Sequence, residues 1–177
     1  MKFIPTTIDG VYIIELEKRE DDRGFLARTW CEKEFRDNGI DVTLAQGYVS
    51  GTKCKGTIRG IHWQTHPRAE TKLTRCNKGA LFEVVTDVRP DSPTYKKWEG
   101  FTFRADDYRM LFMPKGVGHA ILTLEDDTEF TNFSDTAYSP EHERGMRYDD
   151  GSFSVRWPIS VEHVSEKDKA WGPFMWA

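Results

Sequence analysis

The sequence has little of several features that would assign it to other classes of protein. Its 177 residues include only three cysteines, Cys31, Cys54 and Cys76, at scattered positions. So few cysteines exclude a disulfide framework, and reduced thiols are typical of a cytoplasmic protein. No apolar run approaches membrane-spanning length, and no basic segment followed by an apolar one opens the chain. We therefore expect a cytoplasmic protein with no membrane partner.

Basic charge is not in excess either. Lys and Arg total 25 against 29 Asp and Glu, which gives a formal net charge of -4. Binding of nucleic acid needs a basic face, so we expect no nucleic-acid partner. No internal repeat or linker divides the sequence, and its length suits one domain with a substantial core. We predict a single domain over residues 1–177.

Helical patterns are rare, whereas short strand patterns are frequent. One short helix is expected, from Thr29 or Cys31 to Asn38, where Asn38-Gly39 would end it. Strands separated by turn residues are predicted at 11–14, 25–30, 44–50, 57–64, 71–76, 80–88, 98–104, 109–113, 118–124 and 129–134. This spacing predicts an all-β antiparallel fold, with a jelly roll first among the options. Near the C-terminus, Trp171, Phe174 and Trp176 are expected to dock on the body or on a partner subunit.

The strand at 57–64 carries the most informative side chains, among them Arg59, His62 and Gln64. Polar groups on a strand that should face a core are costly unless they are satisfied or used. Strict alternation places His62 and Arg59 on opposite faces of this strand. If both serve one cavity, a bulge or twist near Gly60 must redirect one of them. Alternation also places Lys72, Thr74 and Cys76 on one face, compatible with a pocket wall.

Several motifs in a fixed order resemble the dTDP-4-dehydrorhamnose 3,5-epimerase family of deoxysugar biosynthesis. The likeness runs from about Asp21 to Asp168, and the order of the motifs makes it specific. The motifs are Asp22-Arg23-Gly24-Phe25, residues 56–64, Lys72-Leu73-Thr74-Arg75-Cys76, Asp87-Val88-Arg89, Ser92-Pro93-Thr94, Pro114-Lys115-Gly116 with His119, residues 140–145 and Ser165-Glu166-Lys167-Asp168.

The resemblance implies a cupin-type jelly-roll barrel with a few short helices and an N-terminal strand arm. It also implies a homodimer with an exchanged N-terminal strand, no metal and no other cofactor. The implied substrate is a nucleotide diphosphate-linked 4-keto-6-deoxyhexose, whose C4 ketone acidifies the protons on C3 and C5. Inverting either centre needs a base on one face, a group that holds the enolate, and an acid on the other face.

The resemblance also implies roles for individual residues. His62 matches the catalytic base, Asp168 the carboxylate that orients it, and Lys72 the group that supports the enolate oxygen. Taken alone, Asp168 would be a solvated residue in a polar run, and Lys72 a surface residue. The implied substrate-binding residues are Arg23, Phe25, Gln46, Tyr48, Arg59, His119, Tyr138 and Glu143.

Two of these binding residues are arginines, whose forked guanidinium binds phosphate oxygens in pairs. Arg59 matches a residue that contacts the diphosphate or the sugar. Arg23 resembles a second diphosphate contact that reaches the neighbouring subunit's site. Glu83 stands where the family usually has aspartate, and we expect it to pair with an inward polar group.

The sequence departs from the family pattern around the expected pocket. The family's acid is a tyrosine two residues after a Glu-Phe pair, and here that position is Asn132. Asparagine can polarise a carbonyl or hold a water, but it has no proton of suitable acidity. Tyr48 lies in a segment, residues 46–49, where the family tends to have Gln-Asp-Asn-His. Arg28 and Phe133 replace a common glutamate and lysine.

These departures leave three alternatives for the activity. The protein inverts one centre only, with protonation by Tyr48, Tyr138 or a water; it uses another nucleotide sugar; or it binds a sugar nucleotide without turning it over. A metal cupin would use His62, His66 and His119 with Glu70 or Glu83, but the usual ligand spacing is not met. A scaffolding role would not need so many charged and aromatic pocket residues.

Overall fold

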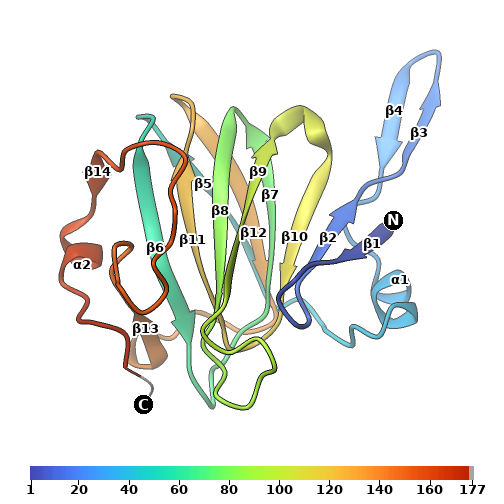
Figure 1. Ribbon diagram of the computed structural model, residues 1–177. Coiled ribbons are helices and arrows are strands. Elements are labelled where there is room, and N and C mark those ends of the chain that lie inside the picture. Colours follow the sequence, from blue (N-terminus) through green and yellow to red (C-terminus); the bar gives the residue numbers. More distant parts are fainter. Residues whose placement is uncertain (176–177) are drawn as a thin grey trace.

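Two facing antiparallel sheets contain most of the regular structure (Figure 1). The computed structural model describes residues 1–175. The elements are β1 (Lys2–Pro5), β2 (Tyr12–Glu15), β3 (Lys18–Asp21), β4 (Gly24–Ala27), α1 (Glu32–Asp37), β5 (Gln46–Thr52), β6 (Thr57–Gln64), β7 (Lys72–Lys78), β8 (Ala80–Asp87), β9 (Trp98–Arg104), β10 (Arg109–Met113), β11 (Val117–Thr123), β12 (Thr128–Ser134), β13 (Glu143–Gly145), β14 (His163–Val164) and α2 (Glu166–Lys169). None of these helices is long and apolar enough to cross a membrane.

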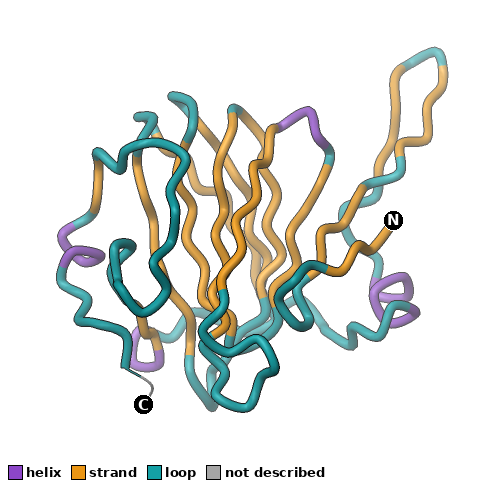
Figure 2. The backbone as a smooth tube through the Cα atoms, in the orientation of Figure 1, coloured by secondary structure: helices purple, strands orange, loops and turns teal. Residues whose placement is uncertain are grey.

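The strand order confirms the predicted all-β jelly-roll barrel. One sheet has the order β1-β2-β10-β7-β12-β5, and the other has the order β13-β6-β11-β8-β9 with β14 beside β6. Figure 2 shows the strands forming the walls of the barrel and the loops gathering at their ends. The strands predicted from 44 to 134 and the helix lie close to the observed elements.

The prediction was wrong at three places in the N-terminal region, and one of them is β3, because Lys18–Asp21 was not predicted as a strand. The strand expected at 25–30 ends at Ala27, because the chain turns there toward α1. Lys2–Pro5 forms a strand that was not predicted, since its pairing with β2 depends on backbone hydrogen bonds rather than on a strong hydrophobic pattern.

Side-chain alternation divides the apolar residues into an inner core and two outer ones. On β10, Leu111 and Met113 point into the barrel, whereas Met110 and Phe112 pack outside it against Phe35 of α1. The outer face of the second sheet is covered by the C-terminal third of the chain, including Phe153. Each sheet therefore has apolar packing on both of its faces, although Val49 on the edge strand β5 remains 64% exposed.

The β3–β4 hairpin projects from the barrel as an arm, whereas the N-terminal strand β1 pairs with β2 of its own chain (Figure 1). Arg23 lies at its tip, and Phe25 and Leu26 on β4 are 46% and 64% exposed. The Phe25 ring also packs on Tyr108 of the same chain, with 4.9 Å between ring centroids. An arm that exposes large apolar side chains is suited to contact with another molecule.

The C-terminal segment lies along β6 and closes one side of the site (Figure 1). The Trp171 ring lies so close to Gly145 that a Cβ there would come within 2.5 Å of it. The Phe174 ring lies 5.1 Å from the Phe153 ring. The prediction that the terminal aromatic residues dock on the body is confirmed for Trp171 and Phe174, and Trp176 lies outside the described residues.

Candidate active site

A β-bulge in β6 brings Arg59 and His62 to the same face. His119 of β11 pairs with His62, but the next residue, Ala120, pairs with Gly60, so Ile61 is an extra residue. Ile58, Ile61 and Trp63 therefore all pack in the same outer core, which strict alternation would not allow. Gly60 permits this because its φ is +118° and a Cβ would lie 2.5 Å from the His119 carbonyl oxygen. The predicted redirection near Gly60 is confirmed.

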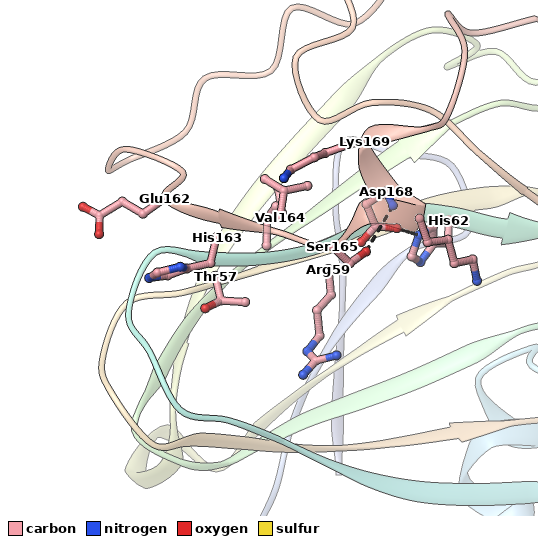
Figure 3. A pocket seen from close by; sticks show the side chains of 11 residues that line it. Thr57, Arg59, His62, Glu162, His163, Val164, Ser165, Asp168 and Lys169 are labelled. Atoms are coloured by element: carbon pink, nitrogen blue, oxygen red, sulfur yellow. Dashed lines mark hydrogen bonds and ion pairs between the residues drawn. The ribbon is translucent and has the colours of Figure 1, made fainter.

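His62 is paired with Asp168, as expected. Its Nε2 lies 2.5 Å from Oδ1 of Asp168, whose side chain is 5% exposed (Figure 3). The second carboxylate oxygen accepts a hydrogen bond from the Gly60 N–H, and Ser165 caps the short helix that carries Asp168. Burial alone would raise the pKa of Asp168, but the hydrogen bonds from His62, Ser165 and Gly60 together hold it below its usual value.

His119 and Glu83 form a buried pair behind His62. Nδ1 of His119 lies 3.0 Å from Oε1 of Glu83. Burial raises the pKa of Glu83 to about 8, and burial together with the charges of Lys72 and His62 lowers the pKa of His119 well below its usual value. At neutral pH both groups are therefore neutral. This confirms the expectation that Glu83 pairs with an inward polar group.

Lys72 supplies a positive charge inside the barrel. Its Nζ lies 3.1 Å from Oε1 of Glu70, and the two side chains are 9% and 10% exposed. Ser134 donates a hydrogen bond to the other Glu70 oxygen, at 3.1 Å. Thr74 and Cys76 follow on the same face of β7, with Thr74 buried and Cys76 in the inner core. The face of β7 that carries Lys72, Thr74 and Cys76 is thus polar beside the cavity, at Lys72, and apolar in the inner core, at Cys76.

Asn132 and Tyr48 are direct neighbours on adjacent strands. They are register partners of β12 and β5, and Nδ2 of Asn132 donates to the Tyr48 hydroxyl at 3.0 Å. Asn132 is 1% exposed, whereas Tyr48 as a whole residue is 47% exposed, with its hydroxyl lying against the buried Asn132. Oδ1 of Asn132, Oγ1 of Thr74 and Oε2 of Glu83 are buried without a hydrogen-bond partner among the described residues. Unpaired buried polar atoms are costly, and Asn132 and Thr74 are register partners on β12 and β7.

Two adjoining cavities share His62. The inner one, of about 310 Å³, is lined by Gln46, Tyr48, His62, Trp63, Gln64, Glu70, Lys72, His119, Tyr138 and Glu143. The outer one, of about 640 Å³, is lined by Arg59, His62 and Asp168 together with residues of the C-terminal segment such as Lys167 and Lys169. Figure 3 shows Arg59 and His62 leaving the same strand, with Asp168 above His62. The arginine side chain reaches β5, where its Nε donates to Oγ1 of Thr52 at 3.1 Å.

At the rim of the inner cavity, Tyr138 and Lys167 both contact Glu143. The Tyr138 hydroxyl donates to Oε2 of Glu143 at 2.7 Å, and Nζ of Lys167 lies 2.5 Å from the same oxygen. Burial would raise the pKa of Glu143, but the hydrogen bonds from Lys167 and Tyr138 bring it below its usual value. The rim is therefore charged and closely hydrogen-bonded.

Arg23 and Phe25 are the two predicted binding residues that lie away from these cavities. Both lie on the β3–β4 hairpin, and the Arg23 guanidinium contacts Asp21 of the same hairpin. Neither residue lines the inner or outer cavity of its own chain. Their predicted roles would require a partner subunit.

Sequence reasoning did not foresee two charged partners in the site. Glu70 was considered only as a metal ligand, yet it neutralises Lys72, and Lys167 contacts Glu143. The sequence signal for the first of these pairs was the two-residue spacing between Glu70, just ahead of β7, and Lys72, its first residue. Among residues 1–175, no three His, Cys, Asp or Glu side chains form a group that could hold a metal ion.

Comparison with known proteins places this geometry in a family. The model of the family dTDP-4-dehydrorhamnose 3,5-epimerase matches residues 5–175. A relative from Sinorhizobium fredii, named dTDP-4-dehydrorhamnose 3,5-epimerase, is 40% identical over 171 residues, which cover 96% of this chain and 88% of the relative.

Solved structures agree with the sequence comparison. The Bacillus anthracis dTDP-4-dehydrorhamnose 3,5-epimerase, with TDP and PPi bound, has a TM-score of 0.93 and 35% identity and covers 98% of this chain and 99% of its own. A 3'-monoepimerase from Streptomyces bikiniensis, in complex with dTDP-quinovose, has a TM-score of 0.88 and 30% identity over 96% of this chain and 86% of its own. Since family model, sequence and fold all match over nearly the whole length, the chain belongs to the dTDP-4-dehydrorhamnose 3,5-epimerase family, isomerases of the cupin-like jelly-roll type that act on sugar nucleotides.

Proposed function

We propose that this protein inverts C3, C5 or both in a dTDP-linked 4-keto-6-deoxyhexose, with His62 as the base. The observation that carries the proposal is the bond between Nε2 of His62 and the buried carboxylate of Asp168, on a histidine that lines both cavities. With Nε2–H donating to Asp168, Nδ1 keeps its lone pair and is the atom that accepts the proton. The carboxylate fixes this tautomer and stabilises the imidazolium that forms.

Lys72 and His119 are suited to hold the enolate. Removal of a proton from C3 or C5 moves negative charge to the C4 oxygen, which the Lys72 ammonium stabilises inside a largely buried cavity. A protonated Glu83 donates to Nδ1 of His119, so that Nε2–H of His119 is available as a second donor. The raised pKa of Glu83 and the lowered pKa of His119 support this neutral arrangement.

The outer cavity is suited to the nucleotide diphosphate. Arg59, Lys167 and Lys169 line it, and phosphate oxygens are bound well by such cations. The Bacillus anthracis relative holds TDP and PPi, and the Streptomyces bikiniensis relative holds dTDP-quinovose. These ligands support a thymidine nucleotide here, with the sugar directed past His62 into the inner cavity.

Inversion of a single centre is the form of the activity that we favour. The Streptomyces bikiniensis relative is named a 3'-monoepimerase, so a similar barrel supports that outcome. The alternative is a protein that binds a sugar nucleotide without turning it over. Asn132 favours that alternative, because it stands where the family pattern has an acidic phenol.

The decisive experiment is hydrogen exchange in heavy water. We would incubate the protein with dTDP-4-keto-6-deoxyglucose and locate deuterium at C3 and C5 by NMR. Exchange at one or both positions, lost in His62→Asn while dTDP still binds by calorimetry, is the expected result. Saturable binding without exchange would establish the binding-protein alternative, and full exchange in His62→Asn would remove His62 from its role.

A homodimer that exchanges the β3–β4 hairpin belongs to the same proposal. The hairpin projects from the barrel with Phe25 and Leu26 exposed, and Arg23 at its tip contacts only Asp21 among the described residues. In a dimer, Arg23 and Phe25 would reach the outer cavity of the partner. Size-exclusion chromatography with light scattering should give a mass twice that of one chain. The Leu26→Glu variant should have the mass of one chain. A parent protein with the mass of one chain would contradict the dimer.

A further inference from the structure

The phenol of Tyr48 lines the inner cavity, and it comes from β5 rather than from β12, the strand expected to carry the acid. In the family pattern, position 132 on β12 is a tyrosine and position 48 on β5 tends to be asparagine. Here the two residue types are reversed, and the structure places the two positions directly opposite each other in the β5–β12 pairing. Cross-strand partners point their side chains to the same face, so the two side chains occupy one region of the cavity.

We propose that Tyr48 is the catalytic acid that returns the proton to the face of the sugar opposite His62, and that Asn132 is its positioning residue. This inference rests on the proposed function, because it assigns the second half of the same reaction. Tyr48 comes from the first sheet and His62 from the second, and both line the inner cavity. A sugar held between them presents one face to each.

The hydrogen bonds of the cavity single out Tyr48 as the group with a free proton. The hydroxyl of Tyr138 donates to Glu143, so its one proton is already engaged. The Tyr48 hydroxyl instead accepts from Nδ2 of Asn132, and no described residue within hydrogen-bond distance accepts its proton. That proton is therefore free to point toward a bound sugar.

The surroundings of Tyr48 keep its phenol protonated at neutral pH. Burial raises its pKa and the negative charge of Glu70 adds to this effect, whereas the hydrogen bond from Asn132 and the charge of Arg59 oppose it. The phenol is therefore protonated before the reaction. When the proton leaves, the Asn132 amide donates to the phenolate and stabilises it.

The reaction balances without any further reactant. His62 takes the proton from the carbon next to the C4 ketone, and the C–H electron pair forms the carbon–carbon double bond of the enolate. The enolate then forms a new C–H bond with the proton of Tyr48 on the opposite face, and the C4 carbonyl is restored. Tyr48 is left as phenolate and His62 as imidazolium, and proton transfer through solvent restores both.

Removing the Tyr48 hydroxyl should separate exchange from inversion. In Tyr48→Phe, His62 still removes the proton and returns solvent deuterium to the same face, so label enters with retention of configuration. Inversion should fall by about 10²-fold or more, which is typical for loss of a general acid. Binding of dTDP by calorimetry should stay unchanged, and Tyr12→Phe, a tyrosine outside the barrel interior, should retain both exchange and inversion.

Two further variants complete the test. The double variant Tyr48→Asn with Asn132→Tyr should recover inversion, because it returns the phenol to the neighbouring strand. Inversion at the parent rate in Tyr48→Phe, or loss of exchange together with inversion while dTDP still binds, would overturn the assignment. The same would follow if Tyr138→Phe alone gave exchange without inversion. Absence of exchange in the parent protein would instead refute the proposed function itself, and this inference with it.

Discussion

His62 and Asp168 are 106 residues apart in the sequence, yet Nε2 of one lies 2.5 Å from Oδ1 of the other. The histidine lies on a barrel strand, and the carboxylate lies on a one-turn helix that the C-terminal segment brings beside it. The proposed base and its carboxylate therefore come from two parts of the fold that meet only when the C-terminal segment is docked.

Asp168→Asn should reduce exchange at the sugar by up to about 10⁴-fold. The amide keeps the side-chain shape, but it does not stabilise the imidazolium and can hold the wrong tautomer of His62. Deuterium wash-in measured by NMR gives the rate. Glu166→Gln on the same helix is the matched control, because the Glu166 side chain is 89% exposed, and it should exchange like the parent. An Asp168→Asn rate within threefold of the parent would contradict the role of the carboxylate.

Gly60→Ala should destabilise the protein by about 2 kcal/mol or more. The added Cβ would lie 2.5 Å from the His119 carbonyl oxygen, at a φ of +118° that other residues rarely adopt. Urea unfolding followed by tryptophan fluorescence measures the loss. Gly51→Ala on β5 is the control, since the nearest atom to its Cβ is 3.9 Å away. Equal stability of the two variants would mean that the bulge tolerates a side chain.

Glu83 should make the stability of the protein depend on pH. Its pKa is about 8 in the folded protein against 4.5 for an ordinary glutamate, as in the unfolded chain. Between these pH values the folded protein therefore binds more protons than the unfolded chain. Its contribution is fully present below about pH 4.5 and is lost as the pH rises through about 8. The free energy of unfolding of the parent should therefore fall relative to Glu83→Gln between pH 5 and pH 8.5. Urea unfolding at several pH values checks this, and parallel curves for the two proteins would refute it.

Arg59→Ala should weaken binding of dTDP by about tenfold or more, because charge-assisted hydrogen bonds to the diphosphate are lost. Arg59→Lys should recover only part of the affinity, since an ammonium lacks the fork of the guanidinium. Isothermal titration calorimetry measures both. Arg147→Ala, which removes an exposed arginine paired with Asp149, should bind like the parent. An unchanged affinity in Arg59→Ala would place the diphosphate elsewhere.

The barrel strands could be predicted from the sequence because turn residues and alternating side chains are local signals. The bulge could also be inferred, since Arg59 and His62 share a cavity only if the alternation is broken near Gly60. The partners of the site were harder to predict. The contacts of Asn132 with Tyr48 and of Lys72 with Glu70 depend on strand register and side-chain reach, which the order of residues does not specify. The proposed place of Arg23 in a site shared between two chains could not be checked from one chain, whether from its sequence or from its fold.

The docked C-terminal segment has a consequence for how the protein becomes active during synthesis. β6 and its paired strands β11 and β13 are complete by Gly145, before β14 and α2 have been made. A barrel that closes at that stage would already hold His62, Lys72 and His119, but without the carboxylate that orients the base. With the proposed roles of His62 and Asp168, full reactivity would have to wait until α2 has been added, and cleavage ahead of Ser165 should leave a barrel whose proposed base has no orienting carboxylate.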